Sequence, residues 1–426
     1  MMDKCRSEGS GRGAVAFGVF ALLLLVSGSG AAQETARSLP NPLRLQDVVR
    51  FARTHRSEIV AARARARAAS ERPAIVSGLE DPMVFPSLDH VPFMLNGVNW
   101  SLTVEQRFPL SGVRGNRQRA AEADAERARA EVGRARLDVE LDSASAFLML
   151  EERRQMVPIL QEQRTLAKQF VDAAIGRYAA GTGPHADALR AEMEASRFDG
   201  AVRAIAADVR AAEAMLNASL GRESGATVPS LESSVSTSPP PSVEVVRKAA
   251  IEQRPELRMG KAEIARAQAE VSVMQSMYAP MAMVRTGPAY TMSDGPGWML
   301  MVGVSVPIWR GRLGAGVAEA NAMVDMAQSD VRAMRTMIEG EALSSRERVV
   351  SVRERLLALR DQVVPRARQT INPTLAGYAS GQLPLVSVID AAQALWSAQS
   401  ELVSAQFELG LARARLERAM GSEGIR

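Results

Sequence analysis

The chain contains two copies of one unit, because its second half repeats its first half at an offset of 198 to 200 residues. Arg254-Pro255-Glu256-Leu257 corresponds to Arg56-Ser57-Glu58-Ile59, and Tyr378-Ala379-Ser380-Gly381 corresponds to Tyr178-Ala179-Ala180-Gly181. Single residues match as well: Trp100 with Trp298, Pro109 with Pro307, Pro184 with Pro384, and Gly221 with Gly421. A duplication of this length predicts two copies of one structural unit, not two unrelated domains.

The first 32 residues have the features of a secretory signal peptide. A basic start precedes an apolar stretch over residues 14–26, and a small-residue segment ends at Ala32. We expect cleavage after Ala32, and the alternative is an uncleaved N-terminal anchor. The single cysteine, Cys5, lies inside this segment, so the mature chain would have neither thiol nor disulfide chemistry. No cysteine follows the apolar stretch, which argues against a lipid anchor.

Composition and motifs exclude several classes of function. The formal net charge of +4 is small for 426 residues and does not indicate nucleic-acid binding. Beyond the signal segment no run of 18 apolar residues occurs, which excludes a transmembrane helix in the mature chain but leaves alternating membrane strands open. The sequence has no nucleophile elbow, phosphate loop or recognisable acid pair, so neither an enzyme nor a cofactor site is predicted.

Each copy is predicted to contain a helix, a β-hairpin and a very long helical hairpin. Ala, Arg and Glu dominate the long segments, and about 65 helical residues would reach about 100 Å. The first copy spans 33–228, with a helix over 45–79, a β-hairpin over 81–108 and a helical hairpin over 112–220. The second copy spans 243–426, with a helix over 254–278, a β-hairpin over 280–307 and a helical hairpin over 311–420. A Ser- and Pro-rich linker, 229–242, joins the copies.

The hairpins contain strands that alternate between apolar and polar residues. Trp100 lies on the apolar side of one strand, and Trp298 lies on the apolar side of its repeat counterpart. The alternation fits tilted membrane strands with both tryptophans at the membrane interface, and the alternative is a small soluble sheet that covers helix ends. Four strands cannot close a barrel, and open edges are not tolerated in lipid. The membrane interpretation therefore predicts that several copies of the chain pool their strands.

Five methionines share the polar side of these strands. They are Met83, Met281, Met283, Met299 and Met301, and the same side carries Ser101, Thr103, Glu105 and Arg285. In a membrane barrel the polar side faces the lumen. Thioethers suit soft ions such as Cu(I). Methionine is also a flexible filler of crowded interiors, and this second interpretation is favoured.

The duplicated layout resembles the TolC-type outer-membrane efflux family, the outer membrane factors. One motif is Phe108-Pro109-Leu110-Ser111-Gly112 with Val306-Pro307-Ile308-Trp309, which resembles the family's passage from strand to helix. Another is Tyr378-Ala379-Ser380-Gly381 running into Val388-Ile389-Asp390-Ala391, which resembles its helix-to-helix turn. The segment that begins at Asp81-Pro82-Met83 is similar to the heavy-metal resistance branch.

The resemblance implies a mainly α protein with a small β part. Three chains would form a homotrimer with a shared twelve-stranded barrel in outer-membrane lipid and a long helical tunnel in the periplasm. It implies a passive efflux duct that meets an inner-membrane pump through a periplasmic adaptor protein, without an enzymatic step. A type I secretion exit channel and a non-channel periplasmic coiled-coil adaptor or scaffold are the alternatives. The transported substrate is not indicated.

The resemblance also implies an acidic entrance at the periplasmic tip. Asp390 matches one of the family's acidic positions, Ser387 occupies the other, and Asp187 lies near the equivalent turn of the first copy. In a threefold ring each aspartate would lie beside two copies of itself, which would favour cation binding. The alternative is that Asp390 is a solvated carboxylate near a helix start, where it suits the helix dipole.

Two tyrosines precede the glycines of the tip turns. Tyr178 precedes Gly181, and Tyr378 precedes Gly381. Either tyrosine could fasten the tip helices across the bundle or pack locally at a helix end. The glycines are predicted to take the left-handed conformation that ends a helix.

We expect the mature protein to begin at Gln33 and to carry no lipid, because the small-residue segment ends at Ala32 without a following cysteine. Intact-mass analysis of the purified protein measures this directly. A mass that includes Met1, or one increased by acyl chains, would contradict the prediction.

Overall fold

The computed structural model describes residues 39–89, 98–233 and 235–422, so the expected signal segment lies outside the described residues. The same order of elements occurs twice along the chain. The first copy contains α2 (Leu45–His55), α3 (Ser57–Ser77), β1 (Met83–Asp89), β2 (Asn99–Pro109), α4 (Val113–Ala179) and α5 (His185–Ser219). The second contains α6 (Val243–Gln253), α7 (Pro255–Ser276), β3 (Met281–Thr291), β4 (Gly295–Ser305), α8 (Arg310–Ala358), the π-helical turn η1 (Leu359–Val363), α9 (Val364–Ala379) and α10 (Leu385–Met420).

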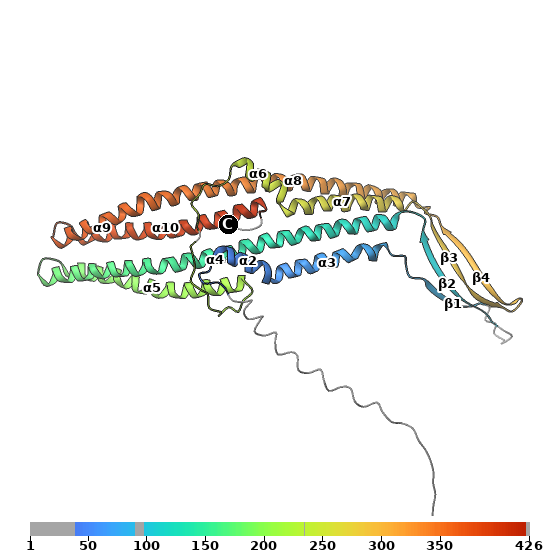
Figure 1. The fold of residues 1–426 in the computed structure, drawn as a ribbon, viewed down its shortest axis with the longest axis horizontal. Helices are drawn as coiled ribbons and strands as arrows, with labels where there is room; N and C mark the ends of the chain where they lie inside the picture. The colour runs from blue at the N-terminus through green and yellow to red at the C-terminus, as the bar shows by residue number, and fades with distance from the viewer. Residues whose placement is uncertain (1–38, 90–97, 234, 423–426) are drawn as a thin grey trace, which may run out of the picture.

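The molecule is elongated, with the strands at one end and the turns between long helices at the other (Figure 1). The longest helix, α4, has 67 residues, which corresponds to about 100 Å. It runs without interruption through Gly133, Pro158 and Gly176. Helices α3, α4, α7 and α8 lie side by side in that order near the strands (Figure 1). Within the described part of the chain, no helix combines the length and the apolarity needed to cross a membrane.

The four strands form one antiparallel sheet in the order β1-β2-β3-β4. The two hairpins join through β2 and β3, with Glu105 opposite Arg285 and Trp100 opposite Tyr290. Strands β1 and β4 are the edges of this sheet. The sheet therefore combines both repeats in one surface, although 171 residues separate the end of β2 from the start of β3.

The sequence prediction of one continuous helix over 45–79 was wrong, because the chain is extended at Arg56 (φ −71°, ψ 128°). The guanidinium group of Arg56 bonds to Glu58 and donates to the backbone oxygen of Ser219 at the end of α5 (2.7 Å). Arg56 also lies 3.8 Å from Asp142 of α4. These contacts stabilise a sharp corner between α2 and α3.

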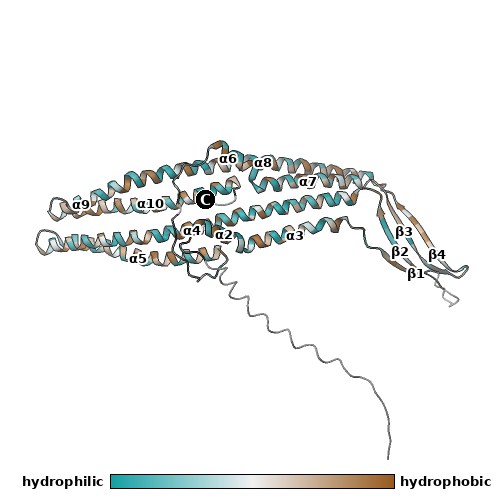
Figure 2. Ribbon diagram, viewed as in Figure 1, coloured by the Kyte–Doolittle hydropathy of each residue, from teal (hydrophilic) through white to brown (hydrophobic). Residues whose placement is uncertain are grey.

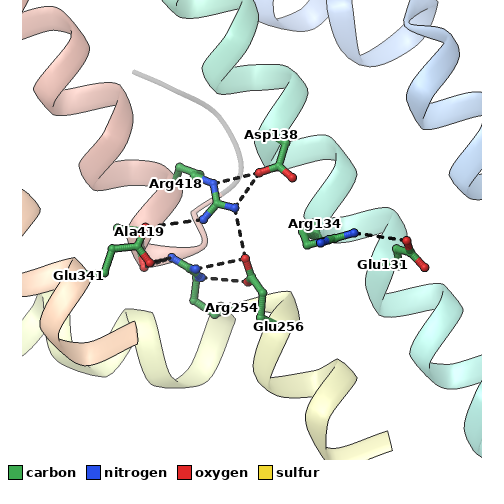
Figure 3. A network of polar contacts seen from close by, with 8 residues as sticks. All are labelled: Glu131, Arg134, Asp138, Arg254, Glu256, Glu341, Arg418 and Ala419. Atoms are coloured by element: carbon green, nitrogen blue, oxygen red, sulfur yellow. Dashed lines mark hydrogen bonds and ion pairs between the residues drawn. The ribbon is translucent and has the colours of Figure 1, made fainter. Parts of the chain in front are cut away.

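The second repeat has the same corner at Arg254 (φ −60°, ψ 122°). Pro255 follows it, and a residue before proline is disfavoured in helical conformation. Arg254 bonds to Glu256 (2.9 Å), to Glu341 (3.1 Å) and to the backbone oxygen of Ala419 (3.3 Å) (Figure 3). The second-repeat helix predicted from Arg254 is accordingly preceded by a separate helix, α6.

Arg418 connects the two repeats beside this corner. Its guanidinium group lies 2.7 Å from Asp138 of α4, 3.3 Å from Glu256 of α7 and 3.8 Å from Glu341 of α8 (Figure 3). Burial opposes the charge of Glu256, but its own backbone N–H, Arg254 and Arg418 outweigh that effect and hold its pKa below the ordinary 4.5. The junction is thus a network of charges, each with an opposite partner.

Replacing Arg254 with leucine should lower the free energy of unfolding by about 2 kcal/mol at neutral pH, because Glu256 loses one of its two cationic partners and keeps only Arg418. A group with a lowered folded-state pKa stabilises the fold above its unfolded pKa and loses that contribution as the pH falls. The difference between wild type and Arg254→Leu should therefore shrink below pH 4.5. Thermal unfolding followed by circular dichroism in detergent measures both effects. The control is Arg335→Leu, since Arg335 is an exposed residue of α8. An equal loss of stability in that variant would contradict the prediction.

Candidate functional site

The sheet exposes apolar side chains on one face and buries polar side chains on the other, as β2 shows. On β2, the apolar Trp100, Leu102 and Val104 are 45, 46 and 44% exposed. The polar Ser101, Thr103 and Glu105 on the opposite face are at most 7% exposed. A sheet of a water-soluble protein buries its apolar face and exposes its polar face. This sheet does the reverse, as expected for strands whose apolar face contacts lipid.

The apolar face continues across the sheet to β4. Its exposed members there are Trp298, Leu300, Val302 and Val304. Figure 2 shows the hydrophobic colouring along this strand. Trp100 lies opposite Tyr290, and the indole N–H of Trp298 donates to the hydroxyl of Thr286 (2.6 Å). Both tryptophans and Tyr290 therefore gather on the apolar face, and Tyr290 is an aromatic residue that the sequence analysis missed.

A row of side chains crosses the polar face through all four strands. Met83 lies opposite Glu105, Glu105 opposite Arg285, and Arg285 opposite Met301. Glu105 accepts hydrogen bonds from Arg285 (3.0 Å) and Arg107 (3.1 Å). The guanidinium carbon of Arg285 also lies 4.5 Å from the ring centre of Phe85. Two arginines, one from each hairpin, thus hold the carboxylate of Glu105.

The register places the remaining methionines on the same polar face. Met281 pairs with Ser305, Met283 pairs with Gly303, and Met299 pairs with Gly287. A Cβ atom at Gly303 would lie 2.9 Å from the methyl group of Met283, so Met283 covers this glycine. The strand alternation therefore correctly predicted that the five methionines share one face. That they line a lumen stays a prediction.

The other end of the molecule consists of two helix turns with left-handed glycines, Gly181 (φ 69°) and Gly381 (φ 81°). Each glycine N–H donates to the backbone oxygen of the tyrosine three residues earlier (3.0 Å). The two tyrosines differ in environment. Tyr178 is 50% exposed beside the ring of His185, whereas Tyr378 is fully buried.

Tyr378 is the centre of a polar cluster that fastens the two turns together. Its hydroxyl donates to Asp187 at the start of α5 (3.2 Å). Arg177 at the end of α4 donates to the backbone oxygen of Tyr378 (2.8 Å) and lies over its ring at 4.7 Å. Burial, followed by the charge of Asp187, raises the pKa of Tyr378, which keeps the phenol protonated as a donor.

The acidic residues predicted at the tip lie in different surroundings. Asp187 is half-buried in the tyrosine cluster. Asp390 is exposed on the second turn of α10, while its neighbours Val388 and Ile389 are buried. Ser387 donates its backbone N–H to the oxygen of Pro384 (3.1 Å). Arg177 was missed, because an arginine near a helix end has no distinctive sequence pattern.

The comparisons with known proteins agree with this geometry. Residues 246–422, in the second repeat, match the family model described as outer membrane efflux protein. The second repeat is therefore similar to outer membrane efflux proteins. No curated protein sequence matches the chain.

Solved structures of outer-membrane channels have the same fold over most of their length. The outer-membrane channel OprN matches at 19% identity and a TM-score of 0.77, covering 89% of this chain and 90% of OprN. VceC, an outer membrane protein of Vibrio cholerae, matches at 17% identity and a TM-score of 0.75, with 90% and 97% covered. CusC, described as forming a transmembrane channel, matches at 13% identity and a TM-score of 0.77, with 89% and 92% covered. The fold class predicted from the sequence is thereby confirmed.

Replacing Tyr378 with phenylalanine should loosen the tip, because the hydrogen bond to the Asp187 carboxylate is lost. Such a bond contributes about 1.5 kcal/mol, which corresponds to about tenfold in an equilibrium between closed and open tips. Single-channel recording in planar bilayers measures the open fraction. The matched control is Tyr178→Phe, since Tyr178 is exposed, and an equal effect of both variants would contradict the prediction.

Asp390→Ala should weaken the block of the channel by multivalent cations and raise its conductance, if three copies of Asp390 form a cation-binding ring. Current at increasing concentrations of a trivalent cation measures the block. Asp330→Ala, an exposed carboxylate on α8 far from the tip, is the control. Unchanged block and conductance would assign Asp390 to an ordinary solvated helix face.

Proposed function

We propose that this protein is the outer-membrane channel subunit of a tripartite efflux system. The observation that carries the proposal is the inverted sheet at the end of the long helical bundle. An apolar face that includes Trp100 and Trp298 suits lipid, and a polar face that includes the Glu105–Arg285 pair suits water. We propose outer-membrane lipid as the environment of the sheet, a periplasmic extension for the helices and a non-lipidated N-terminus.

The edges of the sheet support assembly into a homotrimer. Strand β1 at one edge and β4 at the other belong to different repeats. Unpaired backbone groups in lipid cost several kcal/mol each, so both edges need partners. In the trimer, β4 of one chain pairs with β1 of the next, and three four-stranded sheets close a twelve-stranded barrel.

The helices support a passive duct. They extend about 100 Å from the sheet, far enough to meet a partner in the periplasm. The proposed partners are a periplasmic adaptor protein at the tip turns and an inner-membrane pump that supplies the energy. A type I secretion exit channel also needs a long passive duct with partners in the periplasm. The genes adjacent to this one would discriminate between efflux and secretion. A soluble coiled-coil scaffold is disfavoured by the exposed apolar face.

The trimer is the specific expectation to test. Native mass spectrometry of detergent-purified protein should show three chains, and the same sample should form ion-conducting pores in planar bilayers. A soluble scaffold would instead remain in the aqueous fraction without detergent. A stable detergent-bound monomer without conductance would overturn the proposed function.

A further inference from the structure

The apolar face of the sheet continues past the end of β4. Val306 and Ile308 keep the alternation of the strand and are exposed, and the side chain of Trp309, which follows them, is 72% exposed. An extended chain from Trp298 to Ile308 is about 33 Å long, which at a tilt of about 40° crosses about 25 Å of membrane. This is the height of the apolar band of a membrane barrel. Trp298 and Trp309 therefore mark its two limits, and α8 begins just beyond one of them.

Two arginines follow this limit without a neutralising carboxylate. Residues 306–318 contain Arg310 and Arg312 and no acidic residue. Both arginines are exposed, and neither guanidinium group forms an ion pair with any residue that the structure describes. The hydroxyl of Tyr278 lies against the same turn of α8, since a Cβ atom at Gly314 would be 3.6 Å from it. Four residues form what we call the α8 patch: Tyr278, Trp309, Arg310 and Arg312.

The same level of the first repeat has the opposite charge. The offset of 198 residues that relates Pro109 to Pro307 gives the counterparts of these residues. The second repeat replaces acidic or small residues by aromatic, apolar or basic ones: Glu80 by Tyr278, Asp81 by Ala279, Ser111 by Trp309 and Gly112 by Arg310. Both acidic residues are exposed. The first repeat thus repels an anion where the second repeat attracts one.

The arginine that both repeats share at this level is used differently in each. Arg114 donates to the backbone oxygen of Ser77 at the end of α3 (2.7 Å) and is partly buried. Its counterpart Arg312 is exposed, and its guanidinium group has no acceptor among the residues that the structure describes. Arg114 therefore holds its own repeat together, whereas Arg312 is available to a molecule outside the chain.

We propose that the α8 patch binds the phosphate of an anionic phospholipid, such as phosphatidylglycerol, in the membrane leaflet that faces the helices. This lipid site rests on the proposed function, since it requires the sheet to lie in a membrane. Arg310 and Arg312 provide the positive charge, and a guanidinium group can bind two phosphate oxygens at once. Tyr278 and Trp309 each have an apolar body and a polar tip, which suits the level of the headgroups.

The apolar neighbours of the arginines identify a lipid, and not a soluble anion, as the occupant. A free phosphate ion would gain nothing from the exposed Val306, Ile308 and Trp309. An acyl chain would cover the first two and place its headgroup beside Trp309, at the limit of the apolar band. Charge and apolar surface are therefore complementary to a single molecule, with one such lipid for each chain.

Native mass spectrometry of the purified protein in detergent measures lipid binding directly. Wild type should bind phosphatidylglycerol more tightly than phosphatidylcholine with the same acyl chains. A basic residue at a membrane surface contributes roughly fivefold to such binding, so Arg310→Gln/Arg312→Gln should weaken the binding of phosphatidylglycerol about 25-fold. Binding of phosphatidylcholine should change much less, because glutamine preserves a polar surface without the charge.

The matched control is Arg332→Gln/Arg335→Gln, which removes the same charge from the same helix. Both arginines are exposed and lie about 30 Å further along α8, beyond the membrane surface. This variant should bind phosphatidylglycerol as wild type does, and an equal loss in it would overturn the site. Inorganic phosphate at millimolar concentration should leave the lipid bound. Complete displacement by phosphate would show a site for a soluble anion and would contradict the proposal.

Tryptophan fluorescence tests the position of the patch independently of its charge. Trp100→Phe/Trp298→Phe removes the two other exposed tryptophans and leaves Trp396, which is buried among the helices. In vesicles, the emission of Trp309 should be quenched more by a nitroxide at the lipid headgroup than by one in the middle of the acyl chain. Stronger quenching from the middle of the chain, or none from either label, would overturn the proposal.

The outcomes separate the lipid site from the proposed function. If the protein is a conducting trimer but shows no preference for phosphatidylglycerol, the lipid site is wrong and the channel remains. If the protein does not enter vesicles at all, both proposals fall. A preference that disappears in Arg310→Gln/Arg312→Gln and persists in the control supports the lipid site.

Discussion

The guanidinium group of Arg418 joins the two repeats, and the position of the sheet depends on that junction. Three carboxylates on three helices, Asp138, Glu256 and Glu341, surround this side chain at the end of α10. Because Arg418 bridges Asp138 of α4 and Glu256 of α7, its charge fastens these two helices side by side. The hairpins that precede α4 and follow α7 then emerge together, which allows β2 and β3 to pair and two hairpins to become one sheet.

Regular patterns could be predicted from the sequence, and specific polar contacts could not. The alternation around Trp100 correctly predicted which side chains share a face, because the period of a strand is two residues in any surroundings. The corner at Arg56 was missed, since it depends on a carbonyl group of Ser219 that is remote in sequence. The Glu105–Arg285 pair and the contact of Arg177 with Tyr378 join different repeats, so no local pattern indicates them.

The π-helical turn η1 accounts for the change in the offset between the two copies along the long helices. The offset between copies is 199 residues at Ser143 and Ala342, which are both fully buried, and 200 residues at Tyr178 and Tyr378. One extra residue in an α-helix would rotate every later side chain by about 100°. Because η1 lies between these positions and a π turn holds one more residue, the second copy accommodates the extra residue without ending the helix.

The unequal tyrosines at the tip have a mechanical consequence. The turn after α9 is anchored by a buried ring, a cation over that ring and a hydrogen bond to α5, whereas the ring of Tyr178 in the turn after α4 is half in solvent. Duplication of the chain has therefore not produced two equivalent ends. In a ring of three chains, stiff and compliant turns would alternate, so that the entrance would widen as a triangle and not as a circle.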